Sequence, residues 1–291
     1  MRVERLARGP IITPAMDARI GSNINGPSLV RVPDWINDPL GAYYLYFAHH
    51  KGSYIRMAYA DDLEGPWATY GPGVLDLEDS FFASPEFSSH VASPDVHIDD
   101  ANRQIRMYYH GVVERGVQRS RVAVSKDGID FEAREELLGN PYFRVFRYGG
   151  YHYAIGMPGV FYRSRDGLTG FVEGPALFSE DMRHCAVRLA DDRLSIFFSN
   201  AGDCPERILV SEIDLRVDWM DWRESAPSVV LEPETDFEGA DLALEPSQRG
   251  LTEVRVRQLR DPGIFEENGE TYLLYSVAGE AGIAIARLHD L

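Results

Sequence analysis

The sequence has few cysteines, few basic residues and no long apolar run, and each shortage excludes a class of protein. Only Cys185 and Cys204 occur in 291 residues, so we expect free thiols rather than a disulfide-stabilised secreted fold. No apolar run approaches the ~20 residues of a membrane span. Because 29 basic residues are set against 46 acidic ones, the net charge is −17, which disfavours binding to nucleic acid and to anionic membranes.

The composition is that of a globular protein, and we expect it in the cytoplasm. Residues 1–10 carry Arg2, Arg5 and Arg8 with no apolar stretch after them, which does not fit a secretory signal. The 44% of hydrophobic residues is enough for a large core. Length alone would allow two domains, but repeated all-β folds commonly form one domain at this size. We therefore expect a single domain over residues 1–291, while the sequence specifies no oligomeric state.

A β-hairpin unit recurs along the chain. Its clearest copy, residues 260–276, has an Arg-Asp-Pro start, a short apolar strand, an Asn268-Gly269 turn and an aromatic return strand. Asn-Gly between two such runs is a strong hairpin signal. A third strand follows each hairpin, a Gly/Asp turn leads most copies into a fourth, and no long helix is predicted. The five hairpins cover residues 26–47, 93–109, 140–155, 183–198 and 260–275.

Five such units predict an all-β fold, a five-bladed β-propeller. The last copy ends just after its third strand, so its outer strand must come from another part of the chain or leave an unpaired edge. Residues 11–13, Ile-Ile-Thr, precede the first repeat and are the expected donor. An N-terminal strand is therefore predicted to close the last blade.

The predicted strand directions locate a site. The start of each first strand and the loop after each second strand lie at the same end of a blade, and in a radial array these ends converge where ligands usually bind. Polar residues concentrate at these positions. The catalytic candidates are Asp95, Glu206 and Asp261, and the binding candidates are Asn25, His50, Lys51, His110, Arg144, His184, Arg207, Arg260 and Glu280.

Each catalytic candidate has a structural alternative. We expect Asp95 to be a general base, or else to cap a turn or bond the neighbouring blade. Asp261 is expected to orient or tune that base, or else to begin a turn, because Asp-Pro favours turn initiation. Glu206 is expected to be the general acid, or else to form a local ion pair with Arg207.

Histidines and basic residues widen the range of chemistry. A protonated His50 or His110 is the alternative acid, since imidazole titrates near neutrality. Histidines near carboxylates would also suit a divalent metal, but no compact ligand spacing occurs, so we expect no cofactor. The basic binding candidates on so acidic a protein indicate an anionic feature in the ligand, such as a uronate or phosphate.

The blade starts with Pro after Asp, Ser or Asn, the aromatic hairpins and the Asp-Gly-x-x-Phe turns resemble the five-bladed β-propeller glycosidases. This is the arabinanase, levansucrase and invertase-like group, with glycoside hydrolase family 43 nearest. The resemblance covers residues 23–291 and implies the scaffold and a carbohydrate ligand. Family 43 enzymes use a base at the first blade start, a modulator at the third and an acid at the fourth. Here those starts read Asn25-Gly26-Pro27, Asn140-Pro141-Tyr142 and Arg183-His184-Cys185.

Residues and resemblance together predict a glycoside hydrolase acting on a small oligosaccharide or glycoside. One carboxylate would activate water and one acid would protonate the leaving oxygen. The alternatives are a phosphorylase or a polysaccharide lyase on the same scaffold, and a carbohydrate-binding propeller without catalysis.

Overall fold

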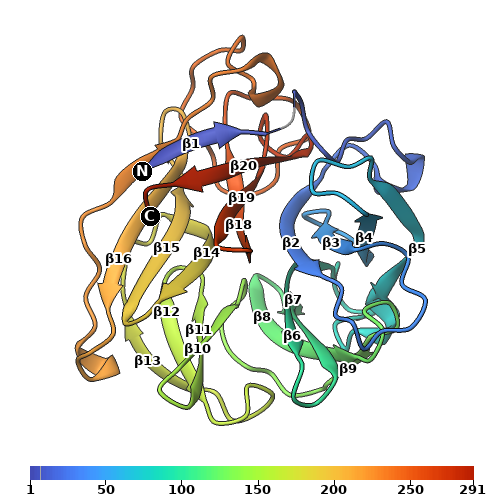
Figure 1. Cartoon of the computed structure of the whole chain (residues 1–291), viewed down its shortest axis with the longest axis vertical. Coiled ribbons are helices and arrows are strands. Elements are labelled where there is room, and N and C mark those ends of the chain that lie inside the picture. The colour runs from blue at the N-terminus through green and yellow to red at the C-terminus, as the bar shows by residue number, and fades with distance from the viewer. Residues whose placement is uncertain (7) are drawn as a thin grey trace.

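Five four-stranded antiparallel sheets stand in a ring in the computed structural model, which describes residues 1–6 and 8–291. Figure 1 shows the ring face-on, with the first strand of each sheet toward the centre and the fourth toward the rim. Strands follow one another in chain order within the first four sheets, whereas the fifth takes its rim strand from the N-terminus. This is the predicted five-bladed β-propeller.

The blades are numbered 1 to 5 in chain order, and their strands are given below in that order. The inner strands are β2 (Asn25–Arg31), β6 (Val91–Asp99), β10 (Arg144–Tyr148), β14 (Met182–Ala190) and β18 (Arg260–Glu267). The second strands are β3 (Tyr43–Ala48), β7 (Gln104–Glu114), β11 (Tyr151–Gly156), β15 (Arg193–Asn200) and β19 (Glu270–Ser276). The third strands are β4 (Tyr54–Ala60), β8 (Val117–Ser125), β12 (Val160–Ser164), β16 (Ile208–Asp214) and β20 (Ile283–His289). The rim strands are β5 (Ala68–Asp76), β9 (Glu132–Ala133), β13 (Val172–Ala176), β17 (Ser228–Leu231) and β1 (Arg2–Arg5).

The second strands are buried on both faces because each lies between two neighbouring blades. All six residues of β3 are buried. Tyr44 and Tyr46 pack into the core shared with blade 2, while Leu45 and Phe47 pack into the core shared with blade 5. Alternate residues of a strand point to opposite faces, so one strand contributes to two cores. The continuous apolar runs in the sequence follow from this packing.

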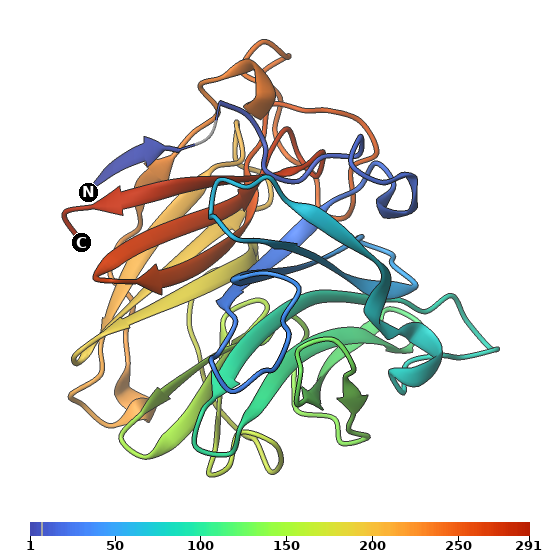
Figure 2. The ribbon, with the colours of Figure 1, turned by 45° about the vertical axis from the view of Figure 1, so that its right-hand side comes forward.

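The ring is closed by the N-terminal strand. β1 pairs antiparallel with β20, from Arg2 opposite His289 to Arg5 opposite Ala286. Figure 2 shows β1 beside the C-terminal strand. The prediction that residues 11–13 supply the outer strand of the last blade is wrong, because β1 supplies it. Ile11 and Ile12 are instead buried in the core between blades 1 and 5. Of that segment, Ile12 forms an isolated bridge to the third strand of blade 5.

Short 3₁₀ helices occupy connections between strands: η1 (Ala18–Ile20), η2 (Leu77–Asp79), η3 (Trp219–Asp221) and η4 (Asp236–Glu238). In residues 1–6 and 8–291, no helix has both the length and the apolar character required to cross a membrane. Cys185 is buried, Cys204 is exposed and both are free thiols, as predicted.

A β-bulge at the start of the inner strand aims side chains toward the centre. In blades 1, 2, 4 and 5, the inner strand has one more residue than the second strand over the same stretch of pairing. Gly26, Ser93 and Asp261 in these bulges have positive φ angles of 62°, 49° and 48°. A Cβ at Gly26 would lie 3.0 Å from the Ser93 Cα, so the close approach of blades 1 and 2 requires glycine there. Bulges commonly re-aim side chains beside functional sites.

Candidate active site

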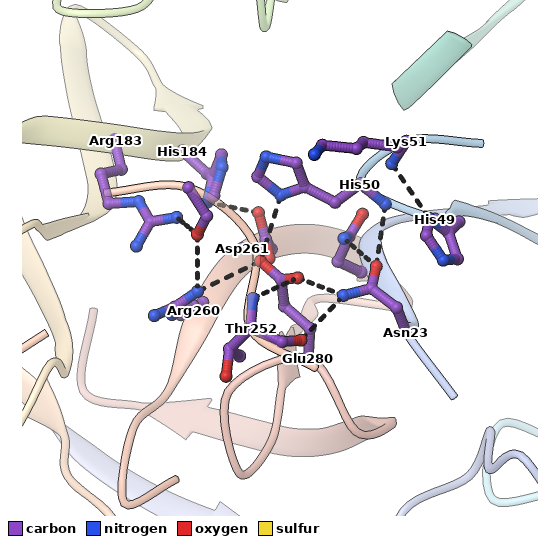
Figure 3. Close-up of polar contacts among 12 residues, drawn as sticks. Asn23, His49, His50, Lys51, Arg183, His184, Thr252, Arg260, Asp261 and Glu280 are labelled. Carbon is purple, nitrogen blue, oxygen red and sulfur yellow. Dashed lines mark hydrogen bonds and ion pairs between the residues drawn. The ribbon is translucent and has the colours of Figure 1, made fainter. Parts of the chain in front are cut away.

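Charged and imidazole side chains from three blades meet at the centre of one face of the ring (Figure 3). They come from strand starts and second-to-third-strand loops, the positions that the sequence predicts to converge. Their burial is nearly complete: the His184 and Asp261 side chains are 3% and 2% exposed, and that of Glu206 is 0% exposed. We call this group the axial cluster, and its members are Asn23, His50, Arg183, His184, Glu206, Arg260, Asp261 and Glu280.

His184 and Asp261 form a buried imidazole–carboxylate pair between blades 4 and 5. The His184 Nδ1 contacts the Asp261 Oδ1. Burial disfavours the ionised carboxylate, but His184 and the charges of Arg183 and Arg260 outweigh it and lower the pKa of Asp261. Burial lowers the pKa of His184, and Asp261 opposes that shift only in part. An ionised Asp261 therefore holds a neutral His184 through Nδ1, which leaves Nε2 to accept a proton.

His50 and Glu280 form a second pair of the same kind. The His50 Nδ1 lies 3.3 Å from the Glu280 Oε1, and the Arg260 Nη1 lies 3.2 Å from the same oxygen. Asn23 accepts a hydrogen bond from the His50 backbone N–H at 2.8 Å and donates through Nδ2 to Glu280. Burial opposes ionisation, yet His50 and Arg260 lower the pKa of Glu280. As in the first pair, the carboxylate orients Nδ1 and leaves Nε2 for chemistry.

Glu206 is enclosed by donors and holds the two arginines of the axial cluster. Its Oε2 lies 3.1 Å from the Arg183 Nη1 and 3.1 Å from the Arg260 Nε. The Ser199 hydroxyl donates to its Oε1 at 2.7 Å. Because one carboxylate oxygen contacts both guanidinium groups, this geometry suits a residue that positions the arginines. The local ion pair with Arg207, the structural alternative, is not formed, since Arg207 instead contacts Glu232 at 2.5 Å.

Three rings in tilted contact extend from His184 toward blade 2. The ring centroids of His184 and Tyr142 are 4.5 Å apart, and those of Tyr142 and His110 are 4.1 Å apart. Burial and the nearby His90 lower the pKa of His110 well below its ordinary value, so this imidazole is neutral. Both His110 nitrogens are buried without a hydrogen-bond partner among the described residues. Since buried polar atoms are nearly always paired, His110 is suited to contact a ligand.

Asp95 lies apart from the other two predicted catalytic carboxylates. Its Oδ2 accepts hydrogen bonds from the His97 Nε2 and from the backbone N–H of Val145 on the next blade, both at 2.8 Å. Within residues 1–6 and 8–291 it has no hydrogen bond or ion pair with the axial cluster. The structure thus places Asp95 as its structural alternative describes, in a contact between blades. Its role as the base stays a prediction that these contacts do not support.

Two predicted binding arginines have other partners. Arg144 donates to the carbonyl oxygens of Ser93, Phe143 and Cys185 at 3.3, 3.1 and 2.9 Å. It therefore ties the inner strands of blades 2 and 4 to its own. Arg207 is paired with Glu232, which is not part of the axial cluster, and its side chain is 33% exposed in that pair.

Two other binding candidates flank the axial cluster. Asn25 is buried and donates to the Asn23 Oδ1 at 3.1 Å, so it supports the residue that orients His50. Lys51 is exposed, and Figure 3 shows its side chain extended past His50 toward the cluster. Lys51 is therefore the basic candidate best placed to meet a ligand at the mouth of the site.

No family model matches this sequence. An uncharacterized protein of Acanthamoeba polyphaga mimivirus is 38% identical over 297 residues, which cover 91% of this chain and 83% of the viral protein. The chain belongs to the same family as this viral protein.

Solved structures similar to this propeller are enzymes of glycoside hydrolase family 43. A β-xylosidase/α-arabinofuranosidase from a compost metagenome has a TM-score of 0.63 at 15% identity, covering 100% of this chain and 96% of that one. A family 43 enzyme of Xanthomonas citri has a TM-score of 0.64 at 16% identity, covering 98% and 92%. An α-L-arabinanase mutant of Cellvibrio cellulosa has a TM-score of 0.63 at 14% identity, covering 92% of both chains. The predicted resemblance to the fold of these glycosidases is confirmed.

Sequence reasoning missed four residues of the site in this propeller. Asn23 is two residues before Asn25, and this polar alternation was a usable signal. Arg183 precedes the predicted His184, but only the bulge brings both side chains to the centre. Tyr142 has a φ of 64°, which no local pattern predicts for a tyrosine. His90, 5.7 Å from His110 between ring centroids, lies outside the repeat pattern.

A stretch of main chain lies against the axial cluster. Residues 248–252, which we call the strap, belong to the long connection between β17 and β18. Arg183 donates to the carbonyl oxygens of Gln248 and Gly250 at 3.3 and 3.1 Å, and Arg260 donates to that of Gly250 at 3.2 Å. The Thr252 carbonyl accepts from the Asn23 Nδ2 at 3.1 Å. These contacts hold the strap on the cluster through charged and amide side chains.

The histidines and carboxylates do not form a metal centre in the described part of the chain. Across residues 1–6 and 8–291, no group of three or more His, Cys, Asp or Glu side chains is arranged to hold a metal ion. The imidazoles of the axial cluster are instead engaged one by one with carboxylates. This arrangement is suited to proton transfer.

Proposed function

We propose that the protein is a glycoside hydrolase in which histidines held by carboxylates carry out the acid–base chemistry. The buried His184–Asp261 pair carries this proposal, because a neutral imidazole oriented by an ionised carboxylate is an effective general base. The propeller fold supports a carbohydrate substrate. The similar metagenome and Xanthomonas citri enzymes are described in complex with xylotriose and with xylose.

The proposed reaction adds water across a glycosidic bond. The His184 Nε2 takes a proton from water while the water oxygen attacks the anomeric carbon. The bond from that carbon to the leaving oxygen breaks, and an imidazolium at His50 gives its proton to the leaving oxygen. Asp261 and Glu280 orient the two rings and stabilise whichever is protonated.

The proposed substrate is a neutral sugar rather than an anionic one. Arg183 and Arg260 are already paired with Glu206, and Arg260 also contacts Glu280. A ligand anion would have to displace these carboxylates or the strap. We infer that the unpaired nitrogens of His110 bind sugar hydroxyl groups instead.

Because the site draws on several blades, we also propose that residues 1–291 act as one domain. We propose that the protein acts in the cytoplasm, whose reducing conditions suit two free thiols.

A glycoside-library screen, with and without phosphate, tests this proposal. Wild-type protein should release sugar without phosphate, and His184→Ala should lose about 10²- to 10⁴-fold in rate. His97→Ala is a matched control, because His97 is also paired with an aspartate but lies outside the axial cluster. Full activity in His184→Ala would overturn the assignment. Phosphate-dependent turnover would instead indicate a phosphorylase, and an unsaturated product absorbing in the ultraviolet would indicate a lyase.

A further inference from the structure

A cavity of about 490 Å³ lies beside the axial cluster. Its walls come from the N-terminal segment at Thr13 and Ser22, from Phe237 in η4, and from residues 252–255. In Figure 2 these segments, dark blue and orange, lie together near the top of the molecule. The volume is within the range of about 300–1,000 Å³ for small-molecule sites. The proposed hydrolysis assigns no role to this cavity.

Glu280 joins the cavity to the proposed reaction centre. It lines the cavity, and its Oε1 faces His50 and Arg260. Its Oε2 accepts from the Thr252 backbone N–H at 3.4 Å, and Thr252 also lines the cavity. A molecule in the cavity therefore lies one residue away from the imidazole that is proposed to protonate the leaving oxygen.

The cavity wall has the chemistry of a site for a neutral sugar. Phe237 is half-buried and offers an apolar ring, while Thr13 and Ser22 bring hydroxyl groups. Two exposed acidic residues, Asp236 and Glu253, line the cavity together with the basic Arg255, whereas the Glu280 carboxylate is 0% exposed and bonded to His50 and Arg260. This excess of negative charge disfavours an anionic ligand, whereas carboxylates and hydroxyls can bond a polyhydroxylated ring.

We propose that this cavity binds a second, neutral sugar unit of the substrate, on the leaving-group side of the bond that is cleaved. The inference rests on the proposed function and deepens it, since it makes an oligosaccharide the substrate rather than a simple glycoside. The axial cluster would hold the unit that is attacked, and the cavity would hold its neighbour next to Glu280 and His50.

Calorimetric titration with neutral linear trisaccharides of xylose, arabinose, glucose, mannose and galactose, and with the matching monosaccharides, tests the cavity. Phe237→Ala removes the ring, and Val254→Trp fills the space from a position that is 69% exposed and therefore tolerant. We expect each variant to weaken trisaccharide binding about tenfold, or ~1.4 kcal/mol, with monosaccharide binding unchanged. Val172→Trp, at a 63% exposed valine on the rim strand β13, is the control and should bind as wild type.

The outcomes separate this inference from the proposed function. If His184→Ala abolishes trisaccharide hydrolysis but both cavity variants keep wild-type affinity, the cavity inference is overturned and the hydrolase stands. If the cavity variants weaken binding but no sugar is cleaved, the cavity stands as a sugar site and the hydrolase is overturned. Failure of wild-type protein to bind any of the sugars overturns both. If Phe237→Ala melts early, the exposed Val254→Trp variant decides.

Discussion

Ser28 and Asp95 occupy the same position in the inner strands of consecutive blades, and each accepts a hydrogen bond from the backbone of the next blade. The Ser28 Oγ accepts from the Val96 N–H at 2.8 Å, and the Asp95 Oδ2 accepts from the Val145 N–H at 2.8 Å. Both residues come directly after the bulge of their strand. The repeated contact fastens one blade to the next, which gives Asp95 a structural role in the propeller.

Asp95→Ala should therefore lower stability without lowering hydrolysis. Loss of the acceptor leaves the buried Val145 N–H unpaired, at a cost of about 1–3 kcal/mol. At roughly 2–4 °C per kcal/mol, the melting temperature should fall by several degrees. Asp95→Ser should recover part of this loss, because Ser28 shows that a hydroxyl can make the same contact. Thermal melts and the library assay check both expectations, and a large loss of activity in well-folded Asp95→Ser would restore Asp95 as the base.

The pH dependence of the reaction should reflect His184. A general base must be neutral, so kcat/KM should rise as pH increases through the pKa of His184. Because burial lowers that pKa, the rise should occur below the ordinary value of about 6.5. Asp261 opposes the lowering, so Asp261→Asn should shift the rise to still lower pH and cut kcat by about 10²- to 10⁴-fold. An unshifted profile in Asp261→Asn would show that another group is titrating, and Asp95→Asn is the control.

Glu206→Gln should strongly destabilise the fold. Removing this buried charge leaves Arg183 and Arg260 without the carboxylate between them, and breaking a buried ion pair costs about 3–5 kcal/mol. Glu232→Gln breaks the exposed pair with Arg207 and should cost about 0–1 kcal/mol. Urea unfolding of both variants measures the difference. Equal midpoints for the two variants would contradict the central placement of Glu206.

Arg5→Ala should destabilise the fold by breaking the contact between β1 and η4. The Arg5 Nε lies 2.8 Å from Glu238, whose side chain is 0% exposed. Burial raises the pKa of Glu238, but Arg5, the Glu234 backbone N–H and Tyr275 outweigh it and lower the pKa overall. The variant strands a buried carboxylate, so we expect a loss of about 3–5 kcal/mol at neutral pH.

The stability lost in Arg5→Ala should depend on pH. The depressed pKa of Glu238 means that its contribution is present above the unfolded value of about 4.3 and disappears as pH falls through the folded value. Melting temperatures of wild type and Arg5→Ala should therefore converge in acid. Arg216→Ala, which breaks a pair 72% and 51% exposed, is the control. A constant gap between the two proteins from neutral to acid pH would exclude Glu238 as the group responsible.

The sequence by itself determined the five blades, the closure of the last blade by an N-terminal segment, though not which residues form that strand, and the face on which polar residues gather. These features follow from local signals, since turn residues such as Asn268-Gly269 and alternating apolar residues act within one hairpin. The sequence also brought His184, Asp261, His50 and Glu280 to the same end of their blades, because strand direction alone fixes the end on which a residue lies.

Only the tertiary structure decided which of these residues meet. One extra residue in a strand changes the face to which later side chains point, so the bulge directs Asp261 to His184 and directs Asp95 to the next blade. Glu206 finds Arg260 across 54 positions of sequence, and no local pattern carries that contact. Partners between blades depend on register and close packing around the centre, whereas the sequence records strands and turns one hairpin at a time.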